Sequence, residues 1–134
     1  MKITLQNPVR HFEVGWFEHK TVMSDCGAIT LAPEEIITFV TESGTEYDLA
    51  RKSWGYYATP SLGDRLYNFK LRAVMTVNHL GKYSIQLVEK GCEDRFFKYL
   101  REEQMTVVTW LDSNGKLNKL QNLISSELPE LTKE

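Results

Sequence analysis

Residues 51–65 are the stretch of the chain in which side chains suited to binding are most concentrated. They hold three aromatic residues, three hydroxyl residues and an arginine at each end. Aromatic faces, hydroxyl groups and an arginine fork are groups with which proteins hold sugars, nucleotides or carboxylates. The predicted ligand-binding residues are Trp54, Tyr56, Tyr57, Ser61, Asp64 and Arg65, together with His79 from a later turn. The alternative interpretation is that Trp54 and Tyr56 pack in a core and that residues 59–65 only connect two strands.

No set of residues makes a recognisable catalytic or metal site. Cys26 could act as a nucleophile with His19 or His79 as its base, but an isolated cysteine on a strand is usually a small core residue. The three histidines lack the close paired spacing of zinc ligands, and no glycine-rich phosphate-binding motif is present. The sequence therefore predicts no catalytic residue, no metal and no cofactor.

Apolar residues that alternate with period two predict β-strands from the N-terminus to about residue 90. The clearest predicted strands cover residues 12–16, 36–40, 47–50, 69–77 and 83–88. Hairpin turns are expected at residues 42–45, where Gly44 can take a positive φ, and at residues 78–81. The hairpin of residues 69–88 has one apolar face along both strands, which predicts a central place in an antiparallel sheet.

The period changes to that of an α-helix after about residue 91. Residues 93–104 show helical spacing, and Glu93 and Asp94 fall in the first turn, where carboxylates favour the positive end of the helix dipole. Residues 107–111 have the pattern of a short buried strand.

A second helix is predicted over residues 117–128 and ends at Pro129, because proline cannot continue the backbone hydrogen bonds. The alternative interpretation takes Asn114–Gly115 as a hairpin turn. Residues 131–134 are expected to fray.

The length and the charge limit the classes of protein to which the chain can belong. It has 134 residues and a formal net charge of −2, from 16 basic and 18 acidic residues. This length fits a single domain over residues 1–134, and the charge excludes a general nucleic-acid binder. No apolar run is long enough for a secretory leader or a membrane span. The two cysteines lie far apart in the sequence, so a cytoplasmic location is predicted rather than a disulfide-rich secreted domain.

These patterns predict the α+β class. The expected architecture is a curved, mainly antiparallel sheet of six to eight strands, or a partly closed barrel, with one or two packed helices. The expected concave interior is lined by Trp54, Tyr56, Phe69 and Tyr83.

One block of residues resembles a known group of proteins. Residues 54–62, with residues 46–48 before them and residues 86–89 and 98–103 after them, are similar to small uncharacterised bacterial proteins often encoded among surface-saccharide assembly genes. The resemblance spans about residues 35–112. This group has no established activity, so the resemblance implies a context in surface-saccharide metabolism and no catalytic residues.

The observations together predict a non-catalytic binding or accessory protein of bacterial surface-saccharide metabolism, which recognises a partner protein or a sugar-nucleotide-like ligand. One alternative is a small saccharide-modifying enzyme that uses Tyr57, Asp64, Arg65 and His79. Another alternative is a structural protein that oligomerises through exposed aromatic residues. A two-fold homodimer is expected, because a mostly β chain rich in aromatic residues has sheet edges to cover.

Overall fold

The computed structural model describes residues 1–127, which form eight β-strands and three α-helices. In chain order these elements are β1 (Lys2–Trp16), β2 (His19–Thr30), β3 (Ile36–Val40), β4 (Glu46–Lys52), β5 (Gly55–Thr59), α1 (Asp64–Asn68), β6 (Leu71–Asn78), β7 (Tyr83–Glu89), α2 (Glu93–Glu102), β8 (Met105–Trp110) and α3 (Asn114–Glu127). Among the described residues, no helix combines the length and the apolar character needed to cross a membrane.

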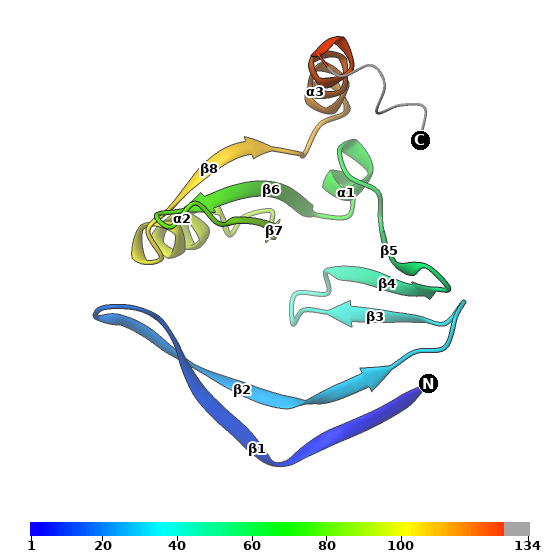
Figure 1. Cartoon of the computed structure of the whole chain (residues 1–134), viewed down its shortest axis with the longest axis vertical. Coiled ribbons are helices and arrows are strands. Elements are labelled where there is room, and N and C mark those ends of the chain that lie inside the picture. Colours follow the sequence, from blue (N-terminus) through cyan, green and yellow to red (C-terminus); the bar gives the residue numbers. More distant parts are fainter. Residues whose placement is uncertain (128–134) are drawn as a thin grey trace.

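The strands form three separate sheets (Figure 1). β1 pairs with β2, β4 lies between β3 and β5, and β6 lies between β7 and β8. Every strand pair is antiparallel, so the predicted α+β class with mainly antiparallel strands is confirmed. Within residues 1–127 the sheets do not close into a barrel, which was the alternative architecture.

Two turns that the sequence indicated have the expected local chemistry. The β3–β4 turn closes with a hydrogen bond from Thr41 N–H to the Thr45 carbonyl oxygen, and Gly44 has a φ of 89°. Such a φ favours glycine, because a side chain would be strained there. In the β6–β7 turn, Asn78 Oδ1 accepts hydrogen bonds from the backbone N–H groups of Leu80 and Lys82. These local contacts fix the register of both hairpins.

Two helices agree with the sequence pattern, and one was not anticipated. α2 occupies the segment where a helix was predicted. α3 spans Asn114–Glu127, so the alternative of a hairpin turn at Asn114–Gly115 is wrong. α1 has five residues, which is too short to show helical periodicity in the sequence. The predicted helix end at Pro129 and the fraying of residues 131–134 lie outside the described residues.

The core lies where α1 packs on β6 and where the chain leaves β8. Its buried residues are Leu66, Leu71, Ala73 and Leu111, and around them pack Tyr47, Met75, Leu87 and Leu117. Val74 and Thr76 on the other face of β6 are also fully buried. Of the hairpin of residues 69–88, which was predicted to be central, β6 is the middle strand of its sheet, whereas β7 lies at an edge.

The aromatic residues expected to line a concave interior do not do so. Trp54, Tyr56, Phe69 and Tyr83 are each more than half exposed. Trp54 lies in the β4–β5 turn, Phe69 precedes β6, and Tyr83 is the first residue of β7. The core is small and centred on Leu66 and Leu71, so residues at strand ends lie beyond its reach.

Leu71→Ala tests the location of the core. Leu71 is 4% exposed, so its truncation should lower the free energy of unfolding by about 2–5 kcal/mol. Ile85→Ala on β7 is the control. Because Ile85 is 54% exposed, this substitution should lower the free energy of unfolding by only about 0.5 kcal/mol. Urea titration followed by circular dichroism measures both losses, and equal losses would contradict the assigned core.

Candidate functional site

The three aromatic residues of the predicted binding segment lie on the β4–β5 hairpin. Trp54 is in the turn between the strands and is 71% exposed. Tyr56 and Tyr57 are neighbours in β5, and both rings are largely exposed. Consecutive residues of a strand point to opposite faces, so the two tyrosines present their rings on the two sides of the sheet.

Arg51 belongs to the same surface, although the sequence did not single it out. It lies opposite Tyr56 in the β4–β5 register, and its guanidinium carbon is 5.6 Å from the centre of the Tyr56 ring. This distance is within the range of a cation–π contact. Arg51 Nη1 also donates a hydrogen bond of 3.1 Å to the Gly55 carbonyl oxygen. Arg51 therefore holds the turn and one of its exposed rings in place.

Ser61, Asp64 and Arg65 lie where β5 leads into α1. Asp64 and Asn114 form a reciprocal pair, in which each backbone N–H donates to the side-chain oxygen of the other at 3.3 and 3.2 Å. Gly63 precedes this pair with a φ of 85°, and a Cβ atom there would collide with Asn114 Oδ1. Asp64 therefore joins α1 to the start of α3. Arg65 and Ser61 are exposed.

His79 lies apart from these residues. It occupies the β6–β7 turn, and its ring meets the Trp16 ring edge-on at a centroid distance of 4.7 Å. α1 and His79 are at opposite ends of β6, which has eight residues and is about 25 Å long. The structure thus brings Trp54, Tyr56 and Tyr57 together on one hairpin, but it does not bring His79 near Asp64 or Arg65.

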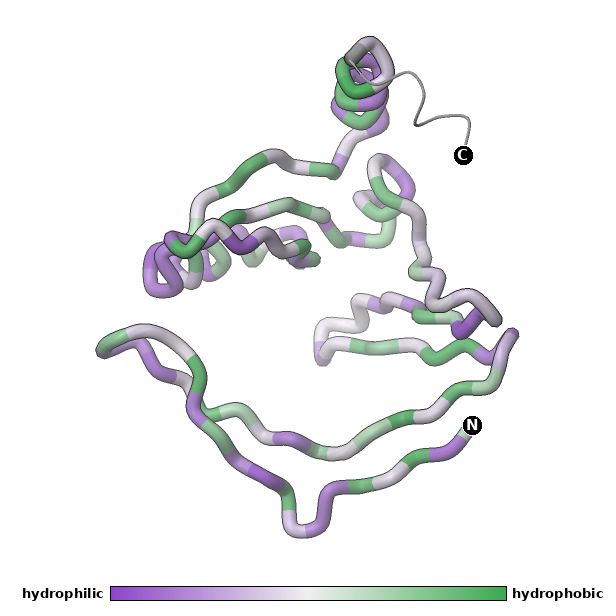
Figure 2. Tube along the Cα trace, viewed as in Figure 1, coloured by the Kyte–Doolittle hydropathy of each residue, from purple (hydrophilic) through white to green (hydrophobic). Residues whose placement is uncertain are grey.

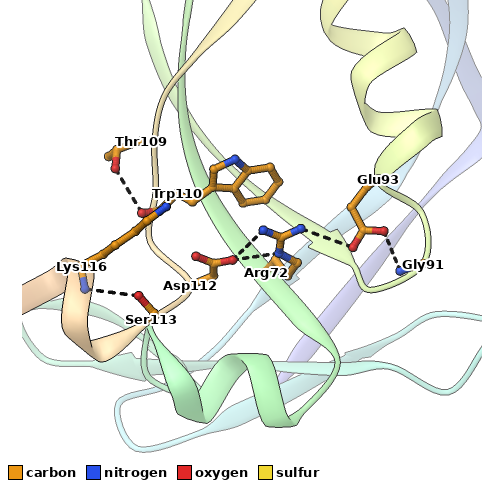
Figure 3. Close-up of polar contacts among 8 residues, drawn as sticks. All are labelled: Arg72, Gly91, Glu93, Thr109, Trp110, Asp112, Ser113 and Lys116. Atoms are coloured by element: carbon orange, nitrogen blue, oxygen red, sulfur yellow. Dashed lines mark hydrogen bonds and ion pairs between the residues drawn. The ribbon is translucent and has the colours of Figure 1, made fainter.

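The most developed polar cluster of the described residues is centred on Arg72, which the sequence did not indicate (Figure 3). Arg72 Nε donates to Asp112 Oδ2 at 2.8 Å, and Nη2 lies 2.8 Å from the same oxygen. Nη1 lies 3.5 Å from Glu93 Oε1, and the guanidinium carbon is 4.0 Å from the centre of the Trp110 ring. Two carboxylates and an indole ring thus satisfy the cation. We interpret the cluster as a structural clamp.

Glu93 is held in its ionised form by this environment. Its own backbone N–H donates a hydrogen bond to the carboxylate, and so does that of Gly91, at 2.8 Å. The Arg72 guanidinium adds a further hydrogen bond and a favourable charge interaction. Together these contacts lower the pKa of Glu93 from its ordinary value.

A cleft of about 250 Å³ lies between the β3–β5 sheet and the β6–β8 sheet. Its walls are largely apolar and include Phe39, Tyr47, Leu71 and Leu87. At its polar end, Ser43 Oγ donates a 3.0 Å hydrogen bond to a carboxylate oxygen of Glu89. The hydroxyls of Thr41 and Ser43 lower the pKa of Glu89. The cleft is smaller than the roughly 300–1,000 Å³ of typical small-molecule sites, and no predicted site residue lines it.

Arg72→Met tests the clamp. The substitution keeps much of the aliphatic stem and removes the charged contacts to Asp112 and Glu93, so unfolding should cost about 1.5–3 kcal/mol less. Arg101→Met in α2 is the control, because Arg101 is exposed and should change stability little. Urea unfolding at neutral pH measures both variants. If both variants lose a similar, small amount of unfolding free energy, Arg72 does not hold α2 and the end of β8 against β6.

Glu93→Gln tests the pH dependence of the same cluster. A carboxylate whose pKa is lowered in the folded state stabilises the fold above its unfolded pKa, and this contribution is lost as the pH falls through the folded pKa. The wild type should therefore exceed Glu93→Gln in stability at neutral pH, and the difference should shrink as the pH falls from about 5 to about 3. Thermal unfolding across this range measures it, with exposed Glu42→Gln as control. A difference that is constant with pH would contradict the assignment.

The predicted site residues that the structure brings together are exposed aromatic side chains of the β4–β5 hairpin. Within residues 1–127, no three histidine, cysteine, aspartate or glutamate side chains gather as metal ligands would. Exposed aromatic rings beside arginines are well suited to be covered by another molecule. No family model, curated protein or solved structure matches this chain.

Proposed function

We propose that the chain is a non-catalytic binding protein of bacterial surface-saccharide metabolism, which acts as a two-fold homodimer and recognises a partner protein. The observation that carries the proposal is the exposure of Trp54, Tyr56 and Tyr57 on one hairpin, with Arg51 fixed against Tyr56. Large apolar groups that gather at a surface mark a site of interaction. Tryptophan, tyrosine and arginine are the residues most enriched where interface energy is concentrated.

A protein partner fits this surface better than a small molecule. A small-molecule site encloses most of its ligand in a cavity, whereas the rings of Tyr56 and Tyr57 lie on opposite faces of a thin sheet. A partner that clasps both sides of the β4–β5 hairpin can cover all three aromatic residues at once. Arg65 lies on α1, six residues after β5 ends, and its exposed side chain can pair with an acidic group at the rim of such a contact.

The separation of titratable groups supports a non-catalytic role. The enzyme alternative needs Asp64 and His79 to act on one substrate, because a general acid or base must lie within hydrogen-bond reach of the proton that it transfers. Asp64 bonds to the start of α3, and His79 packs on Trp16 at the far end of β6. The surface-saccharide context rests on the resemblance of residues 54–62 and their flanking blocks to proteins encoded among such genes.

A photo-crosslinking residue at position 57 tests the proposal. Tyr57→benzoylphenylalanine, produced in the bacterial host of the gene, should crosslink to a protein of surface-saccharide assembly that mass spectrometry can identify. The same residue at Ile85, which is equally accessible on β7, is the control and should not give this product. Adding Trp54→Ala or Arg65→Ala should reduce the yield at least about tenfold, because aromatic and arginine residues dominate interface energies.

The thermal unfolding temperature should stay unchanged in the Trp54 and Arg65 variants, because both side chains are exposed. Crosslinking that is as strong at position 85 as at position 57 would contradict the assigned surface. Calorimetric titration of UDP-glucose into the purified protein tests whether the ligand is a sugar nucleotide and not a protein. Heat of binding that disappears in Trp54→Ala would show a sugar-nucleotide site in place of a protein partner.

A further inference from the structure

The β1–β2 hairpin is a long two-stranded arm with one apolar face. Residues directly opposite each other in an antiparallel pair lie on the same face, and the register pairs Phe12 with Met23 and Ile3 with Ile29. Met23 and Ile29 are an even number of residues apart in β2, so both pairs share one face. The large apolar side chains of this face, 41–74% exposed, are Ile3, Leu5, Phe12, Val14, Met23 and Ile29. We call these six side chains the arm face.

The opposite face of the arm is mostly polar. It carries Lys2, His11, Glu13 and Lys20, together with several hydroxyl residues. Hydrophobic and hydrophilic residues accordingly alternate along the lower two strands in Figure 2. An arm with one apolar and one polar face has the pattern of a sheet that is covered on one side and solvated on the other.

Within residues 1–127, side-chain contacts join the arm to the rest of the chain at its tip and at its base. At the tip, the Trp16 ring meets His79, and His19 Nδ1 lies 3.9 Å from Glu102 Oε1. At the base, the amino group of Met1 lies 2.8 Å from Glu35 Oε2. Figure 1 shows β1 and β2 running below the other strands as a separate layer. Between its ends the arm face is open to solvent. A two-stranded ribbon is marginally stable on its own and needs another element to pack on its apolar side.

The surface area of the chain indicates how large the missing cover is. The chain exposes 10066 Å², whereas a folded monomer of 15.5 kDa exposes about 7,200 Å². The seven residues after Glu127 can account for at most about 1,200 Å², the value for an unfolded segment of that mass. An excess of about 1,700 Å² per copy therefore remains over the whole chain, so a two-fold interface can bury up to about 3,400 Å² from two copies, which is within the range of obligate homodimer interfaces.

The charge pattern of the arm face suits a second copy of the chain. Arg10 and Asp25 lie on the same side of the arm as these six side chains and pair across the two strands at 3.0 Å, so their opposite charges balance. Two identical neutral apolar faces can meet around a two-fold axis without like charges opposing each other. Obligate homodimers bury interfaces that are more apolar than the rest of the surface.

We infer that the arm face is the surface through which the protein dimerises, and that a second copy of the chain covers it. This inference rests on the homodimer of the proposed function and identifies the segment that makes it. By two-fold symmetry the arm of each copy is buried by the other, so the arm is stabilised by dimerisation rather than by its own chain. The exposed aromatic residues Trp54, Tyr56 and Tyr57 belong to a different sheet from the arm.

Met23→Asp and Val22→Asp make a matched pair for testing this inference. The two residues are neighbours in β2, and both are exposed in the single chain, but Met23 belongs to the arm face and Val22 to the polar face. Light scattering coupled to size exclusion, from low to high micromolar concentration, measures the mass. The wild type and Val22→Asp should have twice the monomer mass, and Met23→Asp should raise the dimer dissociation constant at least about 30-fold.

Each result has a distinct meaning. A wild type that is monomeric at every concentration overturns both the homodimer and the inference. A dimeric wild type with a dimeric Met23→Asp overturns the inference alone, and the homodimer of the proposed function stands on another surface. Loss of the dimer in Val22→Asp as well as in Met23→Asp also overturns the assignment to one face.

Deuterium exchange on the wild type provides a second test that needs no substitution. If the arm is covered in the dimer, the amides of residues 10–14 and 21–25 should exchange more slowly in concentrated protein than in dilute protein. The amides of β6, which is buried within one chain, serve as the internal control and should exchange equally at both concentrations. Equal exchange of the arm at both concentrations, across a range in which the mass changes, would overturn the inference.

Discussion

The guanidinium of Arg72 is the contact on which the arrangement of the C-terminal half depends. It anchors two elements to the central strand, because Glu93 begins α2, while Trp110 ends β8 and stacks on the cation and Asp112 follows directly after that strand. Fixing Asp112 also places its neighbour Leu111 in the core against β6. One charged side chain therefore links a sheet to a helix and at the same time positions part of the hydrophobic core.

The buried core is small, and much of the apolar surface of the chain is not covered by another layer. The buried core gathers around α1 and β6, while the β1–β2 arm and the outer strand β3 expose large apolar side chains. A chain of this length ordinarily buries about two-thirds of its unfolded surface. Apolar residues on one face of a strand are stable in water only when another layer covers them. The exposed apolar faces are therefore the parts of the fold that residues 1–127 leave without a covering layer.

The side chains that the sequence predicted as a binding site fall into two groups in the structure. Asp64 and His79 are engaged within the chain, one by the start of α3 and the other by the Trp16 ring. Trp54 and Tyr57 remain exposed on a hairpin that Arg51 holds in shape. Exposed aromatic rings of this kind are suited to be covered by another molecule.

The sequence by itself determined the elements whose signals are local. Alternation along residues 69–88, glycine in the β3–β4 turn and helical spacing after Gly91 depend on neighbouring residues, and each is found in the structure. Only the tertiary structure decided which faces are covered. Arg72 and Asp112 are 40 residues apart, and no spacing rule connects them. The same is true of the arm: alternation in β1 predicted a strand with an apolar side, but whether that side is buried depends on which layers lie over it, and that is set by long-range packing.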